Sequence, residues 1–301
     1  MKRFYTTYLV SAFSDRSFMG NSTGVVIDDG RLTDSDMINI AKDINQSVLV
    51  VVRELDRDRF LTRFFTPKGE INLCGHATVA TFYALAENEY IKSQESGIKK
   101  IIQHTKIGKI PVELEYSNSK IKNVYMNLDI KLKEEFKNVE RVLRILDLEE
   151  ENIGLSISES SKVEKISTGT CDILVPVKDE KTLSSIKLDK KEALELSDME
   201  DIISIHVFTT EDGIEIKQRT FSPIIGEDEE FGSGTSTAAT MHYLNANKIT
   251  ESKFISAIQG DYIGRISKVS ASLTEKENKI RVGGRAYAVS YTHLRAHETR
   301  G

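Results

Sequence analysis

The sequence has no tryptophan, four prolines and two cysteines among its 301 residues. Because Cys74 and Cys171 lie far apart and no Cys-x-x-Cys pair occurs, neither a disulfide framework nor a cysteine metal site is indicated. No apolar run approaches the ~20 residues that a membrane-spanning helix needs, and the N-terminus has no signal-peptide pattern. We therefore expect a cytoplasmic protein without a membrane partner.

The chain also lacks an excess of positive charge. Its formal net charge is −5, and its lysines are spread along the sequence, so nucleic acid is not expected as a partner. The histidines show no ligand spacing, which gives no support to a metal site. With 39% hydrophobic and 29% charged residues, the composition is that of an ordinary globular protein, and the length predicts ~2 domains.

What the chain does contain is one short pattern in two near-copies. The first signature comprises residues 63–67 (RFFTP) and 74–81 (CGHATVAT), and the second comprises residues 219–223 (RTFSP) and 233–240 (SGTSTAAT). The copies are roughly one domain length apart. This repetition favours a duplicated domain over a chance similarity of two strand-loop-helix segments.

The patterning around the first signature predicts mostly strands. Thr33 and Asp36 resemble a capping box that starts a helix ending near Asn45, and residues 74–88 form a second, largely enclosed helix. Residues 14–24 are predicted to be a loop, within which residues 20–24 either present backbone amides to an anion or form a simple turn. Strands are predicted over residues 4–13, 25–27, 48–52, 59–65, 99–104, 109–116 and 122–128.

The second half repeats this order. Its predicted helices are residues 139–146, a charged region at 179–196, and residues 233–245; its predicted strands are 171–177, 202–209, 214–221, 254–258, 264–273 and 279–288. The order predicts an α+β fold of two pseudo-symmetric lobes, residues 1–128 and 129–288, with the last strand able to complete the first lobe. Residues 289–301 look like an adapter-derived artefact tail and are expected to lie outside the fold.

Each signature places a glycine, Gly75 or Gly234, at the predicted start of a helix. Small residues there let a ligand approach the free N–H groups of the first turn, where the helix dipole favours negative charge. Two such helix starts facing each other would hold a carboxylate and stabilise an enolate-like intermediate. The physical prediction is a small carboxylic-acid substrate and proton transfer, without a metal or an organic cofactor.

The segment 73–78 (LCGHAT) is similar to the signature of the PhzF (phenazine biosynthesis-like) family. Residues 20–25 (GNSTGV) resemble the family's N-terminal loop, and residues 259–265 and 282–284 resemble its C-terminal motifs. The resemblance covers essentially all of residues 1–288. It implies the diaminopimelate epimerase-like fold, in which each lobe is a curled, mostly antiparallel sheet around a central helix. It also implies a cofactor-independent isomerase that forms a homodimer.

The resemblance transfers most of the active site. His76 matches the family's histidine and Glu230 takes the place of its aspartate, so both would handle protons, and Thr235 would donate a hydrogen bond to the substrate. Asn21, Gly75, Ser233 and Gly234 complete the implied substrate-binding set.

One family residue is missing. The family's general-base glutamate follows an Asn-x-Ser segment, which here is residues 45–47, and the next residue is Val48. The expected base is therefore replaced by an apolar side chain.

Two other functions stay open. Cys74 occupies the position of the first thiol in two-cysteine racemases, where a helix N-terminus favours the thiolate. Since Ser233 at the second position is a weaker base, a one-base epimerase, racemase or dehydratase is the alternative isomerase. The third possibility, given Val48, is a non-catalytic metabolite-binding protein.

Each candidate residue also has a purely structural interpretation. Cys74 would be a buried small apolar residue, His76 a helix-start residue with a local hydrogen bond, and Glu230 part of a solvated acidic run at residues 227–230. Arg63 and Arg219 are expected to make structural hydrogen bonds.

Overall fold

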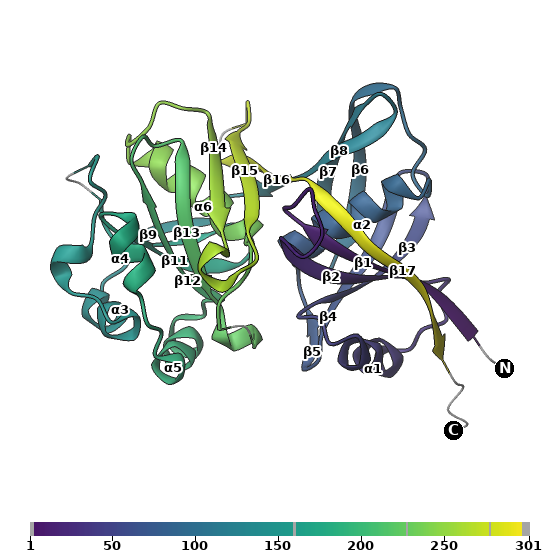
Figure 1. Cartoon of the computed structure of the whole chain (residues 1–301), viewed down its shortest axis with the longest axis horizontal. Helices are drawn as coiled ribbons and strands as arrows, with labels where there is room; N and C mark the ends of the chain where they lie inside the picture. Colours follow the sequence, from purple (N-terminus) through teal and green to yellow (C-terminus); the bar gives the residue numbers. More distant parts are fainter. Residues whose placement is uncertain (1–2, 159–160, 227, 277, 297–301) are drawn as a thin grey trace. The chain divides into compact units, whose positions relative to one another are not determined.

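The computed structural model describes residues 3–158, 161–226, 228–276 and 278–296. The chain divides into two compact units, Met1–Met126 with Gly283–Gly301 and Asn127–Val282 (Figure 1). It passes from the first unit to the second within strand β8 (Lys120–Asp129) and returns within β16 (Lys279–Gly284). None of the helices in the described ranges is both long and apolar enough to cross a membrane.

Besides β8, the strands of the first unit are β1 (Arg3–Ala12), β2 (Asn21–Ile27), β3 (Leu49–Asp56), β4 (Arg59–Thr66), β5 (Gly69–Ile71), β6 (Ser96–Thr105), β7 (Gly108–Ser117) and β17 (Ala286–Ala296). These strands pair mainly antiparallel, with parallel pairing where β2 meets β3 and where β4 meets β6.

Strand β17 corrects the expectation that the fold ends at residue 288. It pairs antiparallel with β1 from Ala286 to Ala296, beside the pairing of β1 with β2 on its other edge (Figure 1). Backbone pairing depends little on side-chain identity, and an unpaired edge of β1 would leave its N–H and C=O groups without partners. Residues 297–301 lie outside the described residues.

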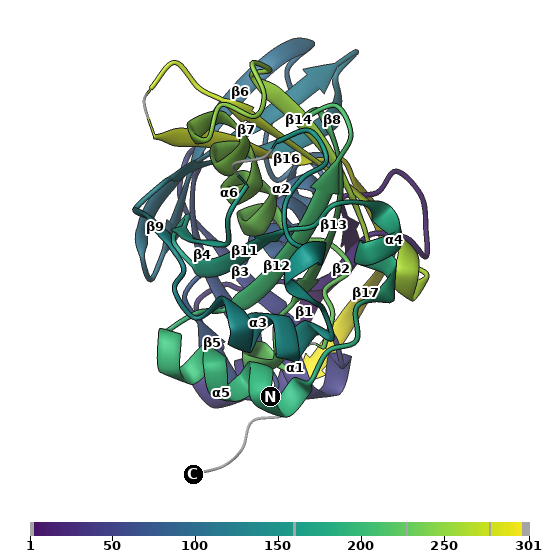
Figure 2. The ribbon, with the colours of Figure 1, turned by 90° about the vertical axis from the view of Figure 1, so that its left-hand side faces the viewer.

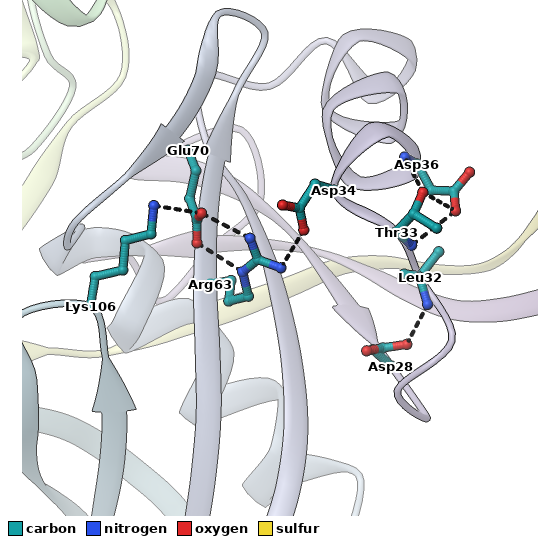
Figure 3. Close-up of polar contacts among 8 residues, drawn as sticks. All are labelled: Asp28, Leu32, Thr33, Asp34, Asp36, Arg63, Glu70 and Lys106. Atoms are coloured by element: carbon teal, nitrogen blue, oxygen red, sulfur yellow. Dashed lines mark hydrogen bonds and ion pairs between the residues drawn. The ribbon is translucent and has the colours of Figure 1, made fainter.

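Helix α1 (Asp34–Ile44) begins as the sequence predicts. The Thr33 hydroxyl accepts the Asp36 N–H at 3.2 Å, and the Asp36 carboxylate accepts the Thr33 N–H at 2.9 Å (Figure 3). The helix ends at Asn45, whose φ of 53° is left-handed. Met37 and Ala41 face a core that includes Leu49 and Phe65. The capping box and the C-terminus are therefore confirmed.

Helix α2 (Gly75–Glu87) is enclosed on all sides, which confirms the helix predicted over residues 74–88. Eleven of its 13 residues are buried, and it contacts β1, β2, β3, β7 and β17. The hydroxyls of Thr78 and Thr81 donate to the carbonyls of Cys74 and Ala77. These bonds satisfy polar groups that burial would otherwise make costly.

The second unit has a mixed sheet with helices on both faces. Besides β16, its strands are β9 (Leu132–Glu135), β10 (Glu164–Ser167), β11 (Cys171–Pro176), β12 (Ser204–Thr210), β13 (Glu215–Phe221), β14 (Phe254–Gln259) and β15 (Ser267–Leu273). Parallel pairing joins β11 to β12 and β13 to β14, and the pairs β9–β10, β10–β11, β12–β13 and β14–β15 are antiparallel.

Alternation along β11 assigns its two faces to different helices. Ile173 and Val175 join the core formed with α3 (Val139–Leu146) and α5 (Lys190–Glu200), which Figure 2 shows side by side. Asp172 and Leu174 point the opposite way, toward α6 (Gly234–Ala246), which contacts β11, β14 and β15. Short 3₁₀ turns occupy Glu150–Asn152, Pro223–Ile225 and Asp261–Ile263.

The charged region predicted as one helix over residues 179–196 is two helices. Helix α4 (Glu180–Ser185) and α5 are capped separately, because Asp179 accepts the Thr182 N–H and Asp189 accepts the N–H groups of Lys191 and Glu192. Two N-caps ten residues apart divide a segment whose charge alone shows no boundary.

The α+β class is confirmed by these mixed sheets with few helices. The duplicated, pseudo-symmetric lobes of the diaminopimelate epimerase type stay a prediction.

Candidate active site

Asn21 is placed by a turn that only glycine accommodates. Gly20 has φ +74°, and a Cβ there would lie 2.3 Å from the carbonyl oxygen of Ala12. Asn21 and Gly24 belong to the β1–β2 ladder, opposite Ala12 and Leu9. The loop predicted over residues 14–24 therefore ends earlier, because residues 21–24 begin strand β2.

His76 lies in the first turn of α2 and is buried beside Asn21. The Nδ2 of Asn21 and the Nδ1 of His76 are 3.1 Å apart. An amide nitrogen is a donor, so Nδ1 accepts and the ring proton of the neutral tautomer resides on Nε2. Burial lowers the pKa of His76 to about 4, because desolvation disfavours the imidazolium. At neutral pH the ring is an uncharged group with a defined tautomer.

Cys74 is the N-cap residue of α2 and is half-buried. Its Sγ lies 3.4 Å from Nδ1 and 3.6 Å from Nε2 of His76. Gly75, the first residue of the helix, is buried next to both. The first unit thus brings four predicted site residues together, and the thiol has a polar neighbour in the His76 ring.

Val48 is buried, and its carbonyl oxygen accepts the N–H of Gly24 at 3.4 Å. The position that the resemblance assigns to the general base is therefore part of the apolar interior.

The start of α6 carries hydroxyls where the start of α2 carries Cys74 and His76. Ser233 is the N-cap of α6, and its Oγ lies 3.4 Å from Thr235 Oγ1 and 2.9 Å from Ser236 Oγ. The backbone N–H of Ser233 donates to Oε1 of Gln259 at 3.1 Å. Gly234 is buried as the first residue of the helix. The second unit therefore brings Ser233, Gly234 and Thr235 together.

Glu230 is buried, which contradicts its assignment to a solvated acidic run. The Ser222 hydroxyl donates to its carboxylate, and its backbone N–H donates to the Thr220 carbonyl at 2.8 Å. Among residues 228–230, Asp228 alone is exposed, and it pairs with Lys190. Glu227 lies outside the described residues. The Glu230 carboxylate is thus held by a hydrogen bond from Ser222, a residue of the second signature.

The signature arginines make matching structural contacts, as predicted. Arg63 donates to both carboxylate oxygens of Glu70 at 2.8 Å and also pairs with Asp34 (Figure 3). Arg219 donates to both oxygens of Glu229 at 2.9 and 2.7 Å. Each glutamate stands four residues before the N-cap of its signature helix. The arginines therefore brace the segments leading into α2 and α6.

The sequence patterns did not identify one buried polar residue that lies beside the start of α6. Asp172 is 2% exposed and accepts hydrogen bonds from the hydroxyls of Ser204 and Ser236, each at 2.8 Å. Burial raises its pKa to about 6, although the two serine donors act in the opposite direction. The signal in the sequence is one acidic residue at the start of an apolar strand.

His206 is a packing residue. It is fully buried between the hydroxyls of Thr220 and Thr240, at 2.8 and 3.0 Å. In the described ranges, no three His, Cys, Asp or Glu side chains gather as ligands of a metal would.

The model of the family described as phenazine biosynthesis-like protein (PhzC-PhzF) matches residues 10–292. The chain belongs to the PhzF family.

Relatives of this PhzF-family chain carry isomerase names. It is 30% identical to an uncharacterized isomerase from Clostridium acetobutylicum, over 98% of this chain and 99% of that protein. It is 24% identical to the trans-2,3-dihydro-3-hydroxyanthranilate isomerase of Pseudomonas aeruginosa, over 93% of this chain and 95% of that enzyme. These relatives support an isomerase-type enzyme.

Solved structures agree on the fold. A PhzF-family protein from Bacillus anthracis superimposes with a TM-score of 0.82 at 23% identity, covering 97% of this chain and 99% of that one. A hydroxyproline epimerase from Agrobacterium vitis, solved with trans-4-hydroxy-L-proline, gives a TM-score of 0.62 at 12% identity, covering 99% and 94%. The fold is therefore shared with proline-epimerase-type proteins.

Proposed function

We propose that this chain is a cofactor-independent isomerase that moves a proton on a small carboxylic acid held at the N-termini of α2 and α6. The observation that carries the proposal is His76, a buried neutral imidazole with Nε2 protonated, fixed in the first turn of α2. Such a ring donates a proton or a hydrogen bond to an enolate-like intermediate at neutral pH. The isomerase names of the relatives support the same reaction class.

The proposed binding set follows from the two helix starts. The N–H groups after Gly75 and Gly234 have no partner one turn earlier in their helices, and they would hold the substrate carboxylate. Thr235 would supply a hydroxyl hydrogen bond, and Ser233 would contact the substrate as the N-cap residue of α6. Asn21 already bonds to His76, so we assign to it the positioning of the ring.

Glu230 is the second proton-handling group in this proposal. Its carboxylate is buried and receives the Ser222 hydroxyl, so it is held in one position beside the second signature. A carboxylate of fixed geometry suits proton transfer, which loses rate when the reacting groups shift by ~1 Å.

A one-base epimerase, racemase or dehydratase using Cys74 is the second candidate. It is favoured by the 3.4 Å separation between Cys74 Sγ and His76 Nδ1. A non-catalytic metabolite-binding protein is the third, and the buried Val48 favours it.

Solvent deuterium exchange at the carbon next to a carboxylate separates the three candidates. We would incubate the protein in D₂O with trans-2,3-dihydro-3-hydroxyanthranilate, trans-4-hydroxy-L-proline and a panel of amino and hydroxy acids, and follow exchange by NMR. Exchange that persists in Cys74→Ala and is lost in His76→Ala or Glu230→Gln supports the isomerase proposal. The opposite pattern assigns the reaction to Cys74. Tight binding with no exchange across the panel identifies a metabolite-binding protein.

The homodimer and the cytoplasmic location stay proposals that rest on the family resemblance and the sequence. Sedimentation of the purified protein tests the first, and cell fractionation tests the second.

A further inference from the structure

The second unit holds a buried carboxylate at the end of a row of hydroxyls. Asp172 on β11 lies opposite Ser204 on β12 in the parallel pairing, and on the face turned toward α6. Ser204 donates to Oδ1 and Ser236 donates to Oδ2, each at 2.8 Å. An ionised carboxylate only accepts, so both serine protons point toward Asp172.

The orientation of Ser236 determines that of Ser233. Because the Ser236 proton is used by Asp172, the Ser236 oxygen accepts at its 2.9 Å contact, and the donor is the Ser233 hydroxyl. The Ser233 oxygen then acts as an acceptor, both at its 3.4 Å contact with the Thr235 hydroxyl and toward a further partner. Ser233 is also the N-cap of α6, where the proposed substrate would lie. The row therefore runs from Asp172 through Ser236 to a residue of the proposed site.

We propose that Asp172, acting through Ser236 and Ser233, supplies the base that Val48 cannot. As the C–H bond of the bound acid breaks, its proton passes to the Ser233 oxygen, the proton of Ser233 passes to Ser236, and that of Ser236 passes to the Asp172 carboxylate. The electron pair of the C–H bond stays on the substrate as an enolate, and reversal of the row returns the proton. Ser233 is the catalytic residue, and Ser236 and Asp172 are positioning residues that act through it. This inference rests on the proposed function.

The electrostatics of Asp172 suit this task. Its raised pKa, about 6, leaves it ionised at neutral pH yet more basic than an exposed carboxylate. The elements packed on it carry few charges near it: His206 on β12 is neutral because burial lowers its pKa to about 3, and Glu164 on β10 pairs with Lys133 at 3.1 Å. The other titratable residues on these elements are Cys171 on β11, Lys165 on β10, and His242 and Tyr243 on α6. Lys165 forms an ion pair with Glu200.

Among the residues that the structure describes, the first signature has no equivalent row. Ala77 stands where the second signature has Ser236, so no hydroxyl links the helix start of α2 to a strand carboxylate. The two helix starts therefore differ: α2 offers the imidazole of His76, and α6 offers serine and threonine hydroxyls.

The first test needs no substrate. ¹³C NMR of the protein labelled at aspartate carboxyls follows the titration of Asp172, assigned with Asp172→Asn. We expect a midpoint near pH 6 that rises in Ser236→Ala and in Ser204→Ala, because each variant loses a donor to the charged form. Ser197→Ala is the matched control: Ser197 is a buried serine on α5 that donates to Ala193, and its loss should leave the midpoint unchanged. A midpoint near the ordinary value of ~4 overturns the proposal, and so does a midpoint that is the same in Ser236→Ala as in the unmodified protein.

The second test uses the acid that shows deuterium exchange. We expect Ser236→Ala to slow exchange by ~100-fold or more, Ser236→Thr to restore it to within ~10-fold, and Ser204→Ala to shift the pH midpoint of the rate upward with that of Asp172. A merely structural role of Asp172 would change stability without moving this midpoint. Exchange that is unchanged in Ser236→Ala refutes the relay and leaves the proposed function standing. A titration that behaves as expected in a protein that exchanges no acid refutes the proposed function, and with it the catalytic use of the row.

Discussion

Asn21 and His76 stand 55 residues apart in the chain and join the start of β2 to the start of α2 by one hydrogen bond of 3.1 Å. The bond determines which ring nitrogen of His76 carries the proton, and therefore which nitrogen can donate to a substrate. The left-handed backbone conformation of Gly20 directly precedes Asn21 and allows its side chain to reach His76. Removing the amide should affect chemistry more than folding.

We expect Asn21→Ala to release the tautomer of His76 and to lower the exchange rate by ~10-fold or more. ¹⁵N NMR of the histidine ring should show protonated Nε2 and bare Nδ1 in the unmodified protein, and a mixture in the variant. Ser22→Ala, the next residue on the same strand, serves as the control. An unchanged ring spectrum in Asn21→Ala would show that other contacts hold the tautomer.

The two signature arginines should differ in their contribution to stability. Arg219 is 10% exposed, and it donates to Glu229 and to the carbonyls of Leu183 and Ile186. Arg219→Met leaves a buried carboxylate and two carbonyls without their donor, and should cost about 3–5 kcal/mol in the free energy of unfolding. Arg63 is 26% exposed, and Lys106 still pairs with Glu70 after its loss (Figure 3), so Arg63→Met should cost about 1 kcal/mol.

Urea denaturation of both variants measures this difference. The double variant Arg219→Met with Glu229→Gln should recover part of the loss, because no charge is then left buried. Equal losses of unfolding free energy in Arg63→Met and Arg219→Met would contradict the prediction that the more buried ion pair contributes more to stability.

The boundary of α1 offers a smaller and cleaner test. Thr33→Ala removes the hydroxyl that accepts the Asp36 N–H and should lower stability by about 1 kcal/mol. Thr33→Ser keeps the cap and should lie close to the unmodified protein. A loss in Thr33→Ser as large as that in Thr33→Ala would mean that the methyl group, not the cap, is responsible.

Local patterns predicted much of this fold. The start and end of α1, the enclosed helix α2 and the order of strands were predictable, because caps and apolar spacing act over a few residues. The short strands β9 and β10 and the division of the charged region between α4 and α5 were not predicted from patterns of this kind. They depend on pairing partners and on two aspartates that the periodicity does not distinguish from their charged neighbours.

The candidate site was predictable only in part. The duplicated signature identified Cys74, His76 and Ser233 as helix-start residues. The partners that define their chemistry come from elsewhere in the chain: Asn21 from β2, and Asp172 from β11. Such contacts depend on register and on which face of a strand meets which helix, and a single sequence states neither.

The buried carboxylate of Asp172 also predicts a pH dependence of stability. Its pKa is about 6 in the folded protein and 3.8 without burial, so the folded state binds more protons than the unfolded state between these values. The contribution of Asp172 to the free energy of unfolding is then highest below pH ~4 and falls as the pH rises to ~6. The difference corresponds to about 3 kcal/mol, at 1.36 kcal/mol for each pKa unit.

Asp172→Asn isolates this contribution from the histidines. Buried His76, with its lowered pKa, has the opposite sign: its contribution makes the protein more stable as the pH rises from ~4 to ~6.5. Because the histidines are common to both proteins, the free energy of unfolding of the variant minus that of the unmodified protein should increase from pH 4 to pH 6 and level off above. Urea denaturation at half-unit pH steps measures it, with Asp198→Asn as the control on the surface helix α5. A difference that stays flat across this range would mean that Asp172 is ionised in the folded protein as readily as an exposed carboxylate, and would remove it as a proton acceptor.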